Sequence, residues 1–316
     1  MKIVFFGSSE FAVPSLDIIV KAGQRVLCVV TQPDRLKGRG LHIEPTALKQ
    51  KALQERLKLF QPPDINSDSA AKFLKTLNAD LFVVIAYGQI LSPEILKIPR
   101  LFSINVHASL LPRYRGAAPM NWSLINGDKE SGITIIKINE KMDAGQIILK
   151  EREAILENDD IVSLEAKLAQ KGAVCLAKSI GMIENNTYAL IEQEEDKADY
   201  APKLHKKDGL VNWGKAAQEI NNLVRGCLVW PGAFTYYNGR LLKIYKTKVT
   251  DYESEGKCEP GEIIAVSKDG ITAACGRGSL LIEELQIEGR KKMAIGEFIA
   301  GHRIKAGERF VPQPQP

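Results

Sequence analysis

The sequence predicts an α/β domain with a doubly wound, mostly parallel sheet, followed by a small β-barrel. In the first half, near-continuous apolar runs alternate with helical stretches, which is typical of parallel strands covered on both faces. After residue 209 the pattern changes to short alternating runs separated by turns, which favours a barrel. A chain of 316 residues is also longer than a typical single domain.

The first domain is expected to hold buried strands at 2–7, 26–31 and 81–86. Residues 11–23 have helical spacing and end in Gly23, a common residue after a helix. Residues 161–183 form a long amphipathic stretch, which we expect to be the last helix of this domain. The opening Gly7-Ser-Ser-Glu-Phe-Ala12 lacks G-x-G-x-x-G, so a dinucleotide site is weakly supported.

The predicted boundaries are a domain over 1–183, a linker over 184–208 and a second domain over 209–316. The linker is rich in charge and poor in large apolar residues. In the second domain a short helical pair is expected between 211–213 and 229–231. Asn238-Gly239 predicts a hairpin turn. The expected strands are 233–237, 241–249, 261–266, 270–274 and 279–287.

Residues 102–107 predict a buried strand that runs into a polar, turn-rich loop. Side chains alternate along a strand, so Asn105 and His107 share one face. The carboxyl end of such a strand is where open α/β sheets bind ligands.

These residue types suit acyl transfer to an amine. Asn105 can donate to the developing oxyanion, and one such donor is typically worth about 3 kcal/mol. His107 can donate or carry a proton near neutral pH, and Asp143 can pair with His107 or accept the amine proton through water. No Ser or Cys nucleophile has a local signature, which favours direct transfer. From spacing alone, ordinary hydrogen-bonded residues at a strand end are an equal alternative.

The complete pattern is more specific. Its segments are Thr31-Gln-Pro-Asp34 with Gly38-Arg-Gly40, Val84-Ile-Ala-Tyr-Gly88, Ile104-Asn-Val-His-Ala-Ser-Leu-Leu-Pro112, Tyr114-Arg-Gly-Ala-Ala-Pro119, Met142-Asp-Ala-Gly145 and Val229-Trp-Pro-Gly232. In this order they resemble the 10-formyltetrahydrofolate-dependent formyltransferases, and most closely those that act on initiator methionyl-tRNA. The resemblance covers essentially the whole chain and implies a Rossmann-like catalytic domain with an OB-like tRNA-binding domain.

The resemblance also implies roles for single residues. Asn105, His107 and Asp143 are the expected catalytic residues. The expected folate site comprises Ser109, Leu110, Leu111, Pro112, Ile85, Ala86, Tyr87 and Gly88. The formyl donor would be 10-formyltetrahydrofolate and the acceptor initiator methionyl-tRNA, with no metal.

A basic loop between Thr31 and Ala47 carries Arg35, Lys37 and Arg39. Long Gly/Pro loops after strands are often functional, and the resemblance makes Arg39 a tRNA contact. A solvated mobile loop is the alternative. Where many relatives continue with lysines, this chain has Leu41-His-Ile-Glu44, which puts the strength of its phosphate contacts in doubt.

Residues 206–316 hold 17 Lys+Arg against 13 Asp+Glu, whereas the first 205 hold 26 against 25. A basic strand face suits a nucleic-acid backbone, although a charged face that contacts only solvent is the simpler interpretation. The candidate tRNA-binding residues there are Lys203, Lys206, Lys243, Lys246 and Lys248, with Lys207, Arg290, Lys291 and Lys292 nearby.

Composition is that of an ordinary globular protein, with 45% hydrophobic and 26% charged residues. No apolar run approaches a membrane span, and no signal-peptide pattern is present. Five scattered cysteines without C-x-x-C favour neither a zinc site nor a disulfide framework. We therefore expect a cytoplasmic monomer.

Other functions remain open at this point. The same chemistry could act on a purine precursor, a sugar nucleotide or water, the last giving a hydrolase. A non-catalytic RNA-binding protein is the alternative from a different class.

Overall fold

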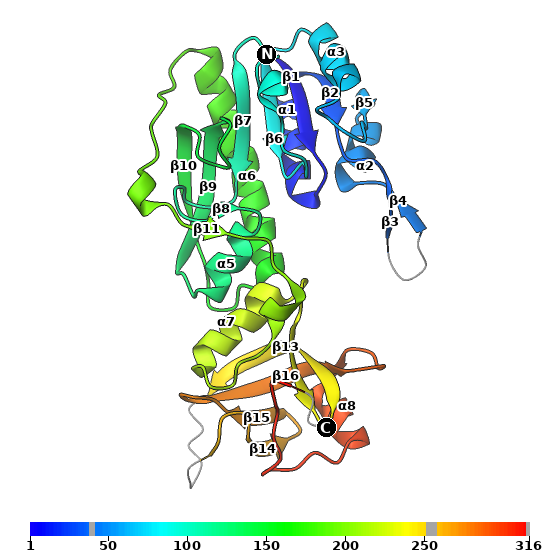
Figure 1. The fold of residues 1–316 in the computed structure, drawn as a ribbon, viewed down its shortest axis with the longest axis vertical. Coiled ribbons are helices and arrows are strands. Elements are labelled where there is room, and N and C mark those ends of the chain that lie inside the picture. Colours follow the sequence, from blue (N-terminus) through cyan, green and yellow to red (C-terminus); the bar gives the residue numbers. More distant parts are fainter. Residues whose placement is uncertain (38–41, 251–257, 314–316) are drawn as a thin grey trace. The chain divides into compact units, whose positions relative to one another are not determined.

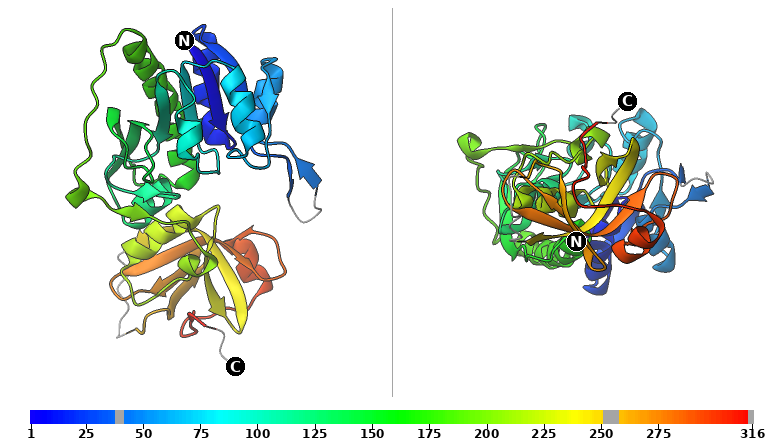
Figure 2. Two further views of the ribbon diagram at one scale, coloured as in Figure 1. Left: turned by 45° about the horizontal axis from the view of Figure 1, so that its top comes forward. Right: turned by 90° about the horizontal axis from the view of Figure 1, so that it is seen from below.

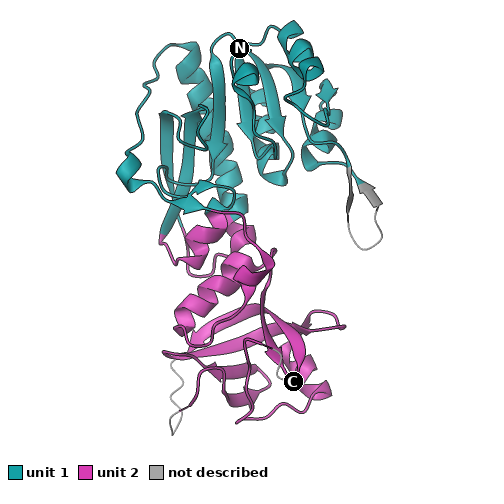
Figure 3. Ribbon diagram, in the orientation of Figure 1, with its two compact units in different colours: residues 1–119, 130–154, 165–201 teal, residues 120–129, 155–164, 202–316 magenta. Residues whose placement is uncertain are grey.

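The computed structural model describes residues 1–37, 42–250 and 258–313. They form two compact units (Figure 3). The first combines 1–119, 130–154 and 165–201, and the second combines 120–129, 155–164 and 202–316. Two short segments from within residues 1–183 thus belong to the second unit. The boundaries 1–183, 184–208 and 209–316 stay a prediction about the linear organisation of the chain.

The first unit is built on a seven-stranded sheet (Figure 1). Its strand order is β10-β9-β7-β6-β1-β2-β5. The five strands from β7 to β5 are parallel, and β9 and β10 are antiparallel to their neighbours. The strands are β1 (Lys2–Gly7), β2 (Arg25–Val30), β5 (Leu59–Phe60), β6 (Leu81–Ile85), β7 (Phe102–His107), β9 (Glu130–Lys137) and β10 (Ile147–Ala154). The predicted mostly parallel sheet is confirmed.

Helices cover both faces of this sheet. On one face, Gly172 of α6 (Ile161–Glu184) lies so close to Val106 that an added Cβ would be 3.2 Å from its side chain. On the other face, α3 (Asp68–Thr76) buries Leu74 in a cluster with Phe6 and Phe82. Asn105 points away from Val106, so it lies on the α3 face.

The remaining elements of the first unit are short. The predicted helix over 11–23 forms as a 3-10 turn, η1 (Glu10–Ala12), followed by α1 (Val13–Lys21). After α1, Gly23 adopts a φ of 74°. The basic loop contains an antiparallel ribbon that the sequence did not predict, and Arg39 lies outside the described residues. The other elements are α2 (Ala47–Gln54), α4 (Pro93–Leu96), β3 (Arg35–Lys37), β4 (His42–Glu44), β8 (Arg115–Gly116), β11 (Tyr200–Ala201) and η2 (Glu195–Lys197).

The second unit contains the predicted antiparallel strands (Figure 2). Their order is β12-β13-β16-β15-β14, and β17 pairs with β16. Asn238 and Gly239 both have positive φ, 47° and 72°, as a tight hairpin turn requires. The strands are β12 (Ala233–Tyr237), β13 (Arg240–Thr250), β14 (Ile263–Ser267), β15 (Gly270–Ala274), β16 (Ser279–Ile287) and β17 (Met293–Ala294).

The C-terminal segment closes this sheet into a barrel. Val311 bridges Tyr236 in β12, and Arg309 bridges Glu262 beside β14. Between them Phe310 points inward and stacks on Trp213 with ring centroids 5.3 Å apart. The last strand of the barrel is therefore a short bridge, which the sequence pattern did not reveal.

The predicted helical pair after residue 211 is wrong. A single α-helix, α7 (Ala217–Cys227), occupies this region, after a 3-10 turn, η3 (Lys206–Gly209). Val211 donates its N–H to the Phe234 carbonyl, and Trp213 is buried with its Nε1 donating to Thr235 Oγ1. Residues 211–213 therefore extend along the barrel because their side chains belong to its core.

Two further helices complete the second unit, α5 (Pro119–Ile125), most of which belongs to it, and α8 (Ile295–Gly301). Within the described residues, we find no helix whose length and apolar character would let it cross a membrane.

Candidate active site

Asn105, His107 and Asp143 converge at the carboxyl end of β7. Asn105 Nδ2 donates to Asp143 Oδ1 at 3.2 Å, and His107 Nδ1 lies 3.6 Å from Asp143 Oδ2. The strand alternation aims both β7 side chains at the same carboxylate. The geometry expected for these three residues is therefore present, although their roles stay a proposal.

Asp143 comes from the loop between β9 and β10. It adopts a left-handed conformation with φ of 49°, which is uncommon for a non-glycine residue. Its Oδ2 also accepts the backbone N–H of Gly116 at 2.9 Å. The carboxylate is thus held from three directions while its side chain stays 16% exposed.

His107 is buried, and its Nε2 lies 2.9 Å from the Tyr114 carbonyl oxygen. Because a carbonyl can only accept, this contact assigns a proton to Nε2. Nδ1 faces the Asp143 carboxylate. Both ring nitrogens of His107 therefore face oxygens of the protein.

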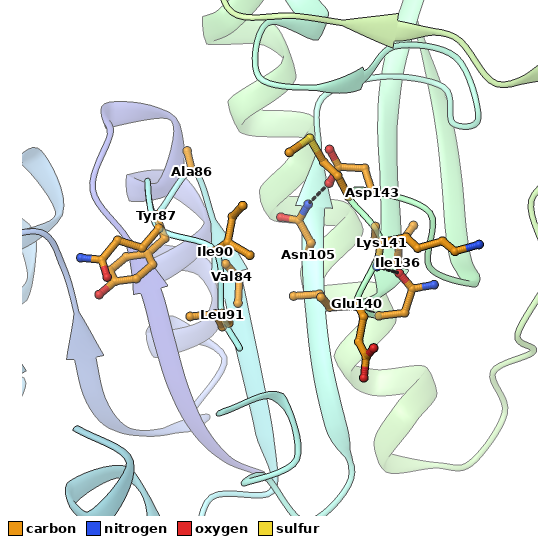
Figure 4. A pocket seen from close by; sticks show the side chains of 14 residues that line it. Val84, Ala86, Tyr87, Ile90, Leu91, Asn105, Ile136, Glu140, Lys141 and Asp143 are labelled. Carbon is orange, nitrogen blue, oxygen red and sulfur yellow. Dashed lines mark hydrogen bonds between the residues drawn. The ribbon is translucent and has the colours of Figure 1, made fainter. Parts of the chain in front are cut away.

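A pocket of about 450 Å³ opens beside Asn105 and Asp143 (Figure 4). Its apolar wall comes from β6 and the following turn, and its polar wall from the loop that carries Asp143. The lining residues are Val84, Ala86, Tyr87, Gln89, Ile90, Leu91, Asn105, Ile136, Ile138, Asn139, Glu140, Lys141, Met142 and Asp143. An apolar slot with a few convergent polar groups suits a flat heterocyclic ligand.

The predicted folate residues divide between this pocket and its surroundings. Ala86 and Tyr87 line it, whereas Ile85 is buried in the sheet and Gly88 continues the turn with a φ of 90°. Burial raises the pKa of Tyr87, so its phenol stays neutral.

The other four predicted folate residues do not line the pocket. The segment Ser109–Pro112 folds back over β9, where Thr134 Oγ1 donates to the Ser109 carbonyl and accepts the Leu111 N–H. Leu110 lies against Gly132, and Leu111 is fully buried before a cis peptide bond to Pro112. Their direct contact with folate stays a prediction.

Strained backbone gathers at this site. Ala86, Tyr114 and Asp143 all have positive φ, at 46°, 61° and 49°. Each such conformation costs about 1–3 kcal/mol and persists only where its surroundings hold it. Two of these residues line the pocket and Tyr114 contacts His107, and such clustering is typical of a functional site.

The predicted basic residues of the second unit differ in their ion pairing. Lys203, Lys206 and Lys248 are exposed and Lys243 is half-buried, and none of them takes part in an ion pair among the described residues. Lys246 pairs with Glu283 at 3.1 Å. In a regular strand Lys246 and Lys248 would share one face and Lys243 would lie on the other, and irregular pairing of β13 around Lys246 breaks this alternation. Their contact with tRNA stays a prediction.

Sequence reasoning missed two residues that support the site. Gln193 lies in the predicted linker, but its Nε2 donates to the carbonyls of Asp143 and Gly145 at 2.7 and 2.8 Å. Arg115 donates to the Gln193 side-chain oxygen through Nε and Nη2. Arg115 lies in the Tyr114–Pro119 segment that carries part of the family resemblance, so the sequence contained a signal for it. Gln193 lies in a polar run, and nothing in that run distinguishes Gln193 from its neighbours.

Comparison with known proteins assigns the chain to a class. Residues 1–180 match the family model described as formyl transferase, and residues 203–303 match that of the formyl transferase C-terminal domain. The chain therefore belongs to the formyl transferase family, as its fold and site indicate.

Within this family it belongs with the methionyl-tRNA formyltransferases. It is 42% identical to that enzyme of Citrifermentans bemidjiense over 97% of this chain and 95% of the relative. It is 44% identical to that of Alkaliphilus oremlandii over 97% of this chain and 98% of the relative.

Solved structures support the fold. The N-formyltransferase from Helicobacter canadensis, complexed with folinic acid and dTDP-3-aminofucose, matches with a TM-score of 0.66 and 22% identity. That match covers 89% of this chain and 98% of the other. The sugar 3N-formyl transferase WlaRD, in the presence of dTDP and 5-N-formyl-THF, matches with a TM-score of 0.65 and 20% identity, covering 92% and 99%.

Proposed function

We propose that this chain transfers the formyl group of 10-formyltetrahydrofolate to the α-amino group of methionine on initiator methionyl-tRNA. The observation that carries the proposal is the convergence of Asn105, His107 and Asp143 beside the apolar pocket. The full-length likeness to methionyl-tRNA formyltransferases supports the choice of acceptor over a sugar or a purine precursor.

In the proposed mechanism the amine nitrogen attacks the formyl carbon directly. The new N–C bond forms as the carbonyl oxygen becomes an oxyanion, and collapse of this intermediate breaks the bond to N10 of the folate. Asn105 has a second amide hydrogen beyond the one given to Asp143, and that hydrogen would stabilise the oxyanion. His107 would join it by turning one ring nitrogen from the Tyr114 carbonyl or from Asp143 toward the oxyanion.

Two proton transfers accompany the reaction. The attacking amine loses a proton, which Asp143 would accept directly or through water, and N10 gains one as it leaves. Asp143 is suited to this role because its carboxylate is partly exposed to the pocket and held by Gly116 and Asn105. The net reaction exchanges one amide bond for another and needs no oxidant or reductant.

The proposed arrangement of ligands follows from the pocket. The folate heterocycle would enter between the Ala86–Tyr87 turn and Ile136, which places its formyl group toward Asn105. Arg39 and four lysines that form no ion pair with the described residues, Lys203, Lys206, Lys243 and Lys248, would contact tRNA phosphates, with Lys246 contributing less. Positioning both substrates can itself contribute several kcal/mol to the rate enhancement.

The decisive assay incubates the protein with 10-formyltetrahydrofolate and methionyl initiator tRNA and measures formylmethionyl-tRNA. Parallel reactions without acceptor, and with a dTDP-amino sugar, test the hydrolase and sugar alternatives. His107→Ala, assayed at the same concentrations, controls for contaminating activity. Product from the amino sugar alone, or equal folate hydrolysis without any acceptor, would overturn the proposal.

A further inference from the structure

We propose that Arg115 and Gln193 form a buried clamp that holds the Asp143 loop in its reactive conformation. Gln193 and Glu195, which lie in the predicted linker, would then serve the active site. The proposal rests on the assignment of Asp143 to the reacting centre. Neither side chain lines the pocket, so both are positioning residues.

Every polar atom of the Gln193 side chain takes part in hydrogen bonds. It is 8% exposed, and its two amide hydrogens go to the carbonyls of Asp143 and Gly145 at 2.7 and 2.8 Å. Its Oε1 accepts from Nε and Nη2 of Arg115 at 3.0 and 2.9 Å. One side chain, Gln193, therefore holds the backbone on both sides of Ala144.

Arg115 in turn fixes the position of the Gln193 side chain. Its side chain is only 2% exposed, and its guanidinium pairs with both carboxylate oxygens of Glu195 at 3.0 and 2.9 Å. A planar guanidinium with two bidentate partners leaves little freedom for either. Hydrogen bonds from Arg115 hold the pKa of Glu195 below the usual range.

The clamp and the carboxylate contact arise from adjacent residues. Gly116, next to Arg115, donates its N–H to Asp143 Oδ2 at 2.9 Å. The short parallel pairing of β8 with β11 holds this segment, with Tyr200 opposite Arg115. One rigid element therefore controls the Asp143 backbone through Gln193 and its carboxylate through Gly116.

The conformation of Asp143 explains why a clamp is needed. Its left-handed backbone, with φ of 49°, is unfavourable by about 1–3 kcal/mol in an unconstrained loop. Without Gln193, the carbonyls of Asp143 and Gly145 would lose their buried donor, and the loop could relax to an ordinary conformation. The carboxylate would then move away from His107 and Asn105.

The test uses Gln193→Glu, which preserves the acceptor for Arg115 but replaces the amide donor with an oxygen facing two carbonyls. We expect kcat to fall at least about tenfold while KM for folate and for tRNA changes by less than about threefold. The matched control is Glu194→Gln on the same segment, because Glu194 is 63% exposed and pairs at the surface with Lys197. It should leave both constants unchanged.

A double-mutant cycle distinguishes positioning from general support of the fold. In an Asp143→Asn background, measured by single turnover, Gln193→Glu should cost less than about twofold because the group it positions is already lost. Equal costs in both backgrounds, or an unchanged kcat in Gln193→Glu, would overturn the clamp. If Gln193→Glu does not fold, Arg115→Lys replaces it, with the same expectation.

Activity of the unmodified protein on methionyl-tRNA is measured in the same series. Its absence would overturn the proposed function, whereas the clamp depends on the ratio between variant and parent. Hydrogen–deuterium exchange of the peptide covering 141–146 adds a readout independent of activity. Exchange should rise in Gln193→Glu and not in Glu194→Gln, and unchanged exchange would count against the clamp.

Discussion

Gly116 donates its backbone N–H to the Asp143 carboxylate at 2.9 Å, while Gly116 itself has a φ of 117°. Few residues other than glycine adopt that conformation. An added Cβ would also lie 2.8 Å from the Ala201 carbonyl oxygen, which is closer than real contacts allow. A backbone position that only glycine tolerates thus aims a donor at the proposed catalytic carboxylate.

Gly116→Ala should therefore impair catalysis through displacement of this N–H. We expect kcat to fall by about tenfold or more, together with a loss of roughly 1–3 kcal/mol in unfolding free energy from strain. Steady-state kinetics and chemical denaturation measure the two effects. Gly181→Ala is the control, since nothing lies within 4 Å of its added Cβ. A fully active Gly116→Ala protein would contradict the proposed role of this contact.

Asn105→Ala should lower kcat by about 10²–10³, as expected for loss of one oxyanion donor. Because Asn105 lies at one edge of the pocket, folate affinity measured by titration should change little. Ile90→Ala is a useful comparison, since Ile90 lines the same pocket, is 76% exposed and carries no polar group. If Asn105→Ala raises KM alone, Asn105 is a binding residue instead.

Asp80 predicts a pH-dependent contribution to stability. The backbone N–H of Lys2 and the Arg100 guanidinium, at 2.8 and 3.0 Å, hold the pKa of Asp80 below its usual range. Because the folded pKa is depressed, the stabilisation is fully present above the unfolded pKa of about 3.9 and is lost as pH falls through the folded value.

Asp80→Asn retains an acceptor for Lys2 but loses the charge, so it should cost roughly 1 kcal/mol at pH 7. Urea denaturation at several pH values should show this difference shrinking as pH falls through the folded pKa of Asp80. Arg100→Ala should cost less, because Arg100 is 72% exposed and such pairs contribute little. A difference independent of pH would show that the Asp80 charge has no role.

Two lysines on one strand should differ in tRNA binding. Lys243 has no ion pair among the described residues, whereas Lys246 pairs with Glu283. Lys243→Ala should weaken tRNA binding and reduce the salt dependence by about one phosphate contact, with a smaller effect for Lys246→Ala. Filter binding across salt concentrations compares them. Equal salt slopes in both variants and the parent would exclude this strand from the interface.

Much of the site was predictable because its signals are local. The β7 alternation placed Asn105 and His107 on one face, and the Asn238-Gly239 turn indicated its hairpin. Such features depend on residues within a few positions of one another. The helical pair failed for the opposite reason, since Trp213 is drawn into a core formed by residues up to 100 positions away.

The sequence alone determined the fold class, the family and the identity of the three converging side chains. Only the tertiary structure decided that Gln193 and Arg115 reach beneath Asp143, that residues 309–311 close the barrel, and that Lys246 is already paired. The residues that these contacts join lie about 40–80 positions apart in the sequence. Periodicity and propensity describe only neighbouring residues, so pairings set by packing and buried hydrogen bonds lie beyond them.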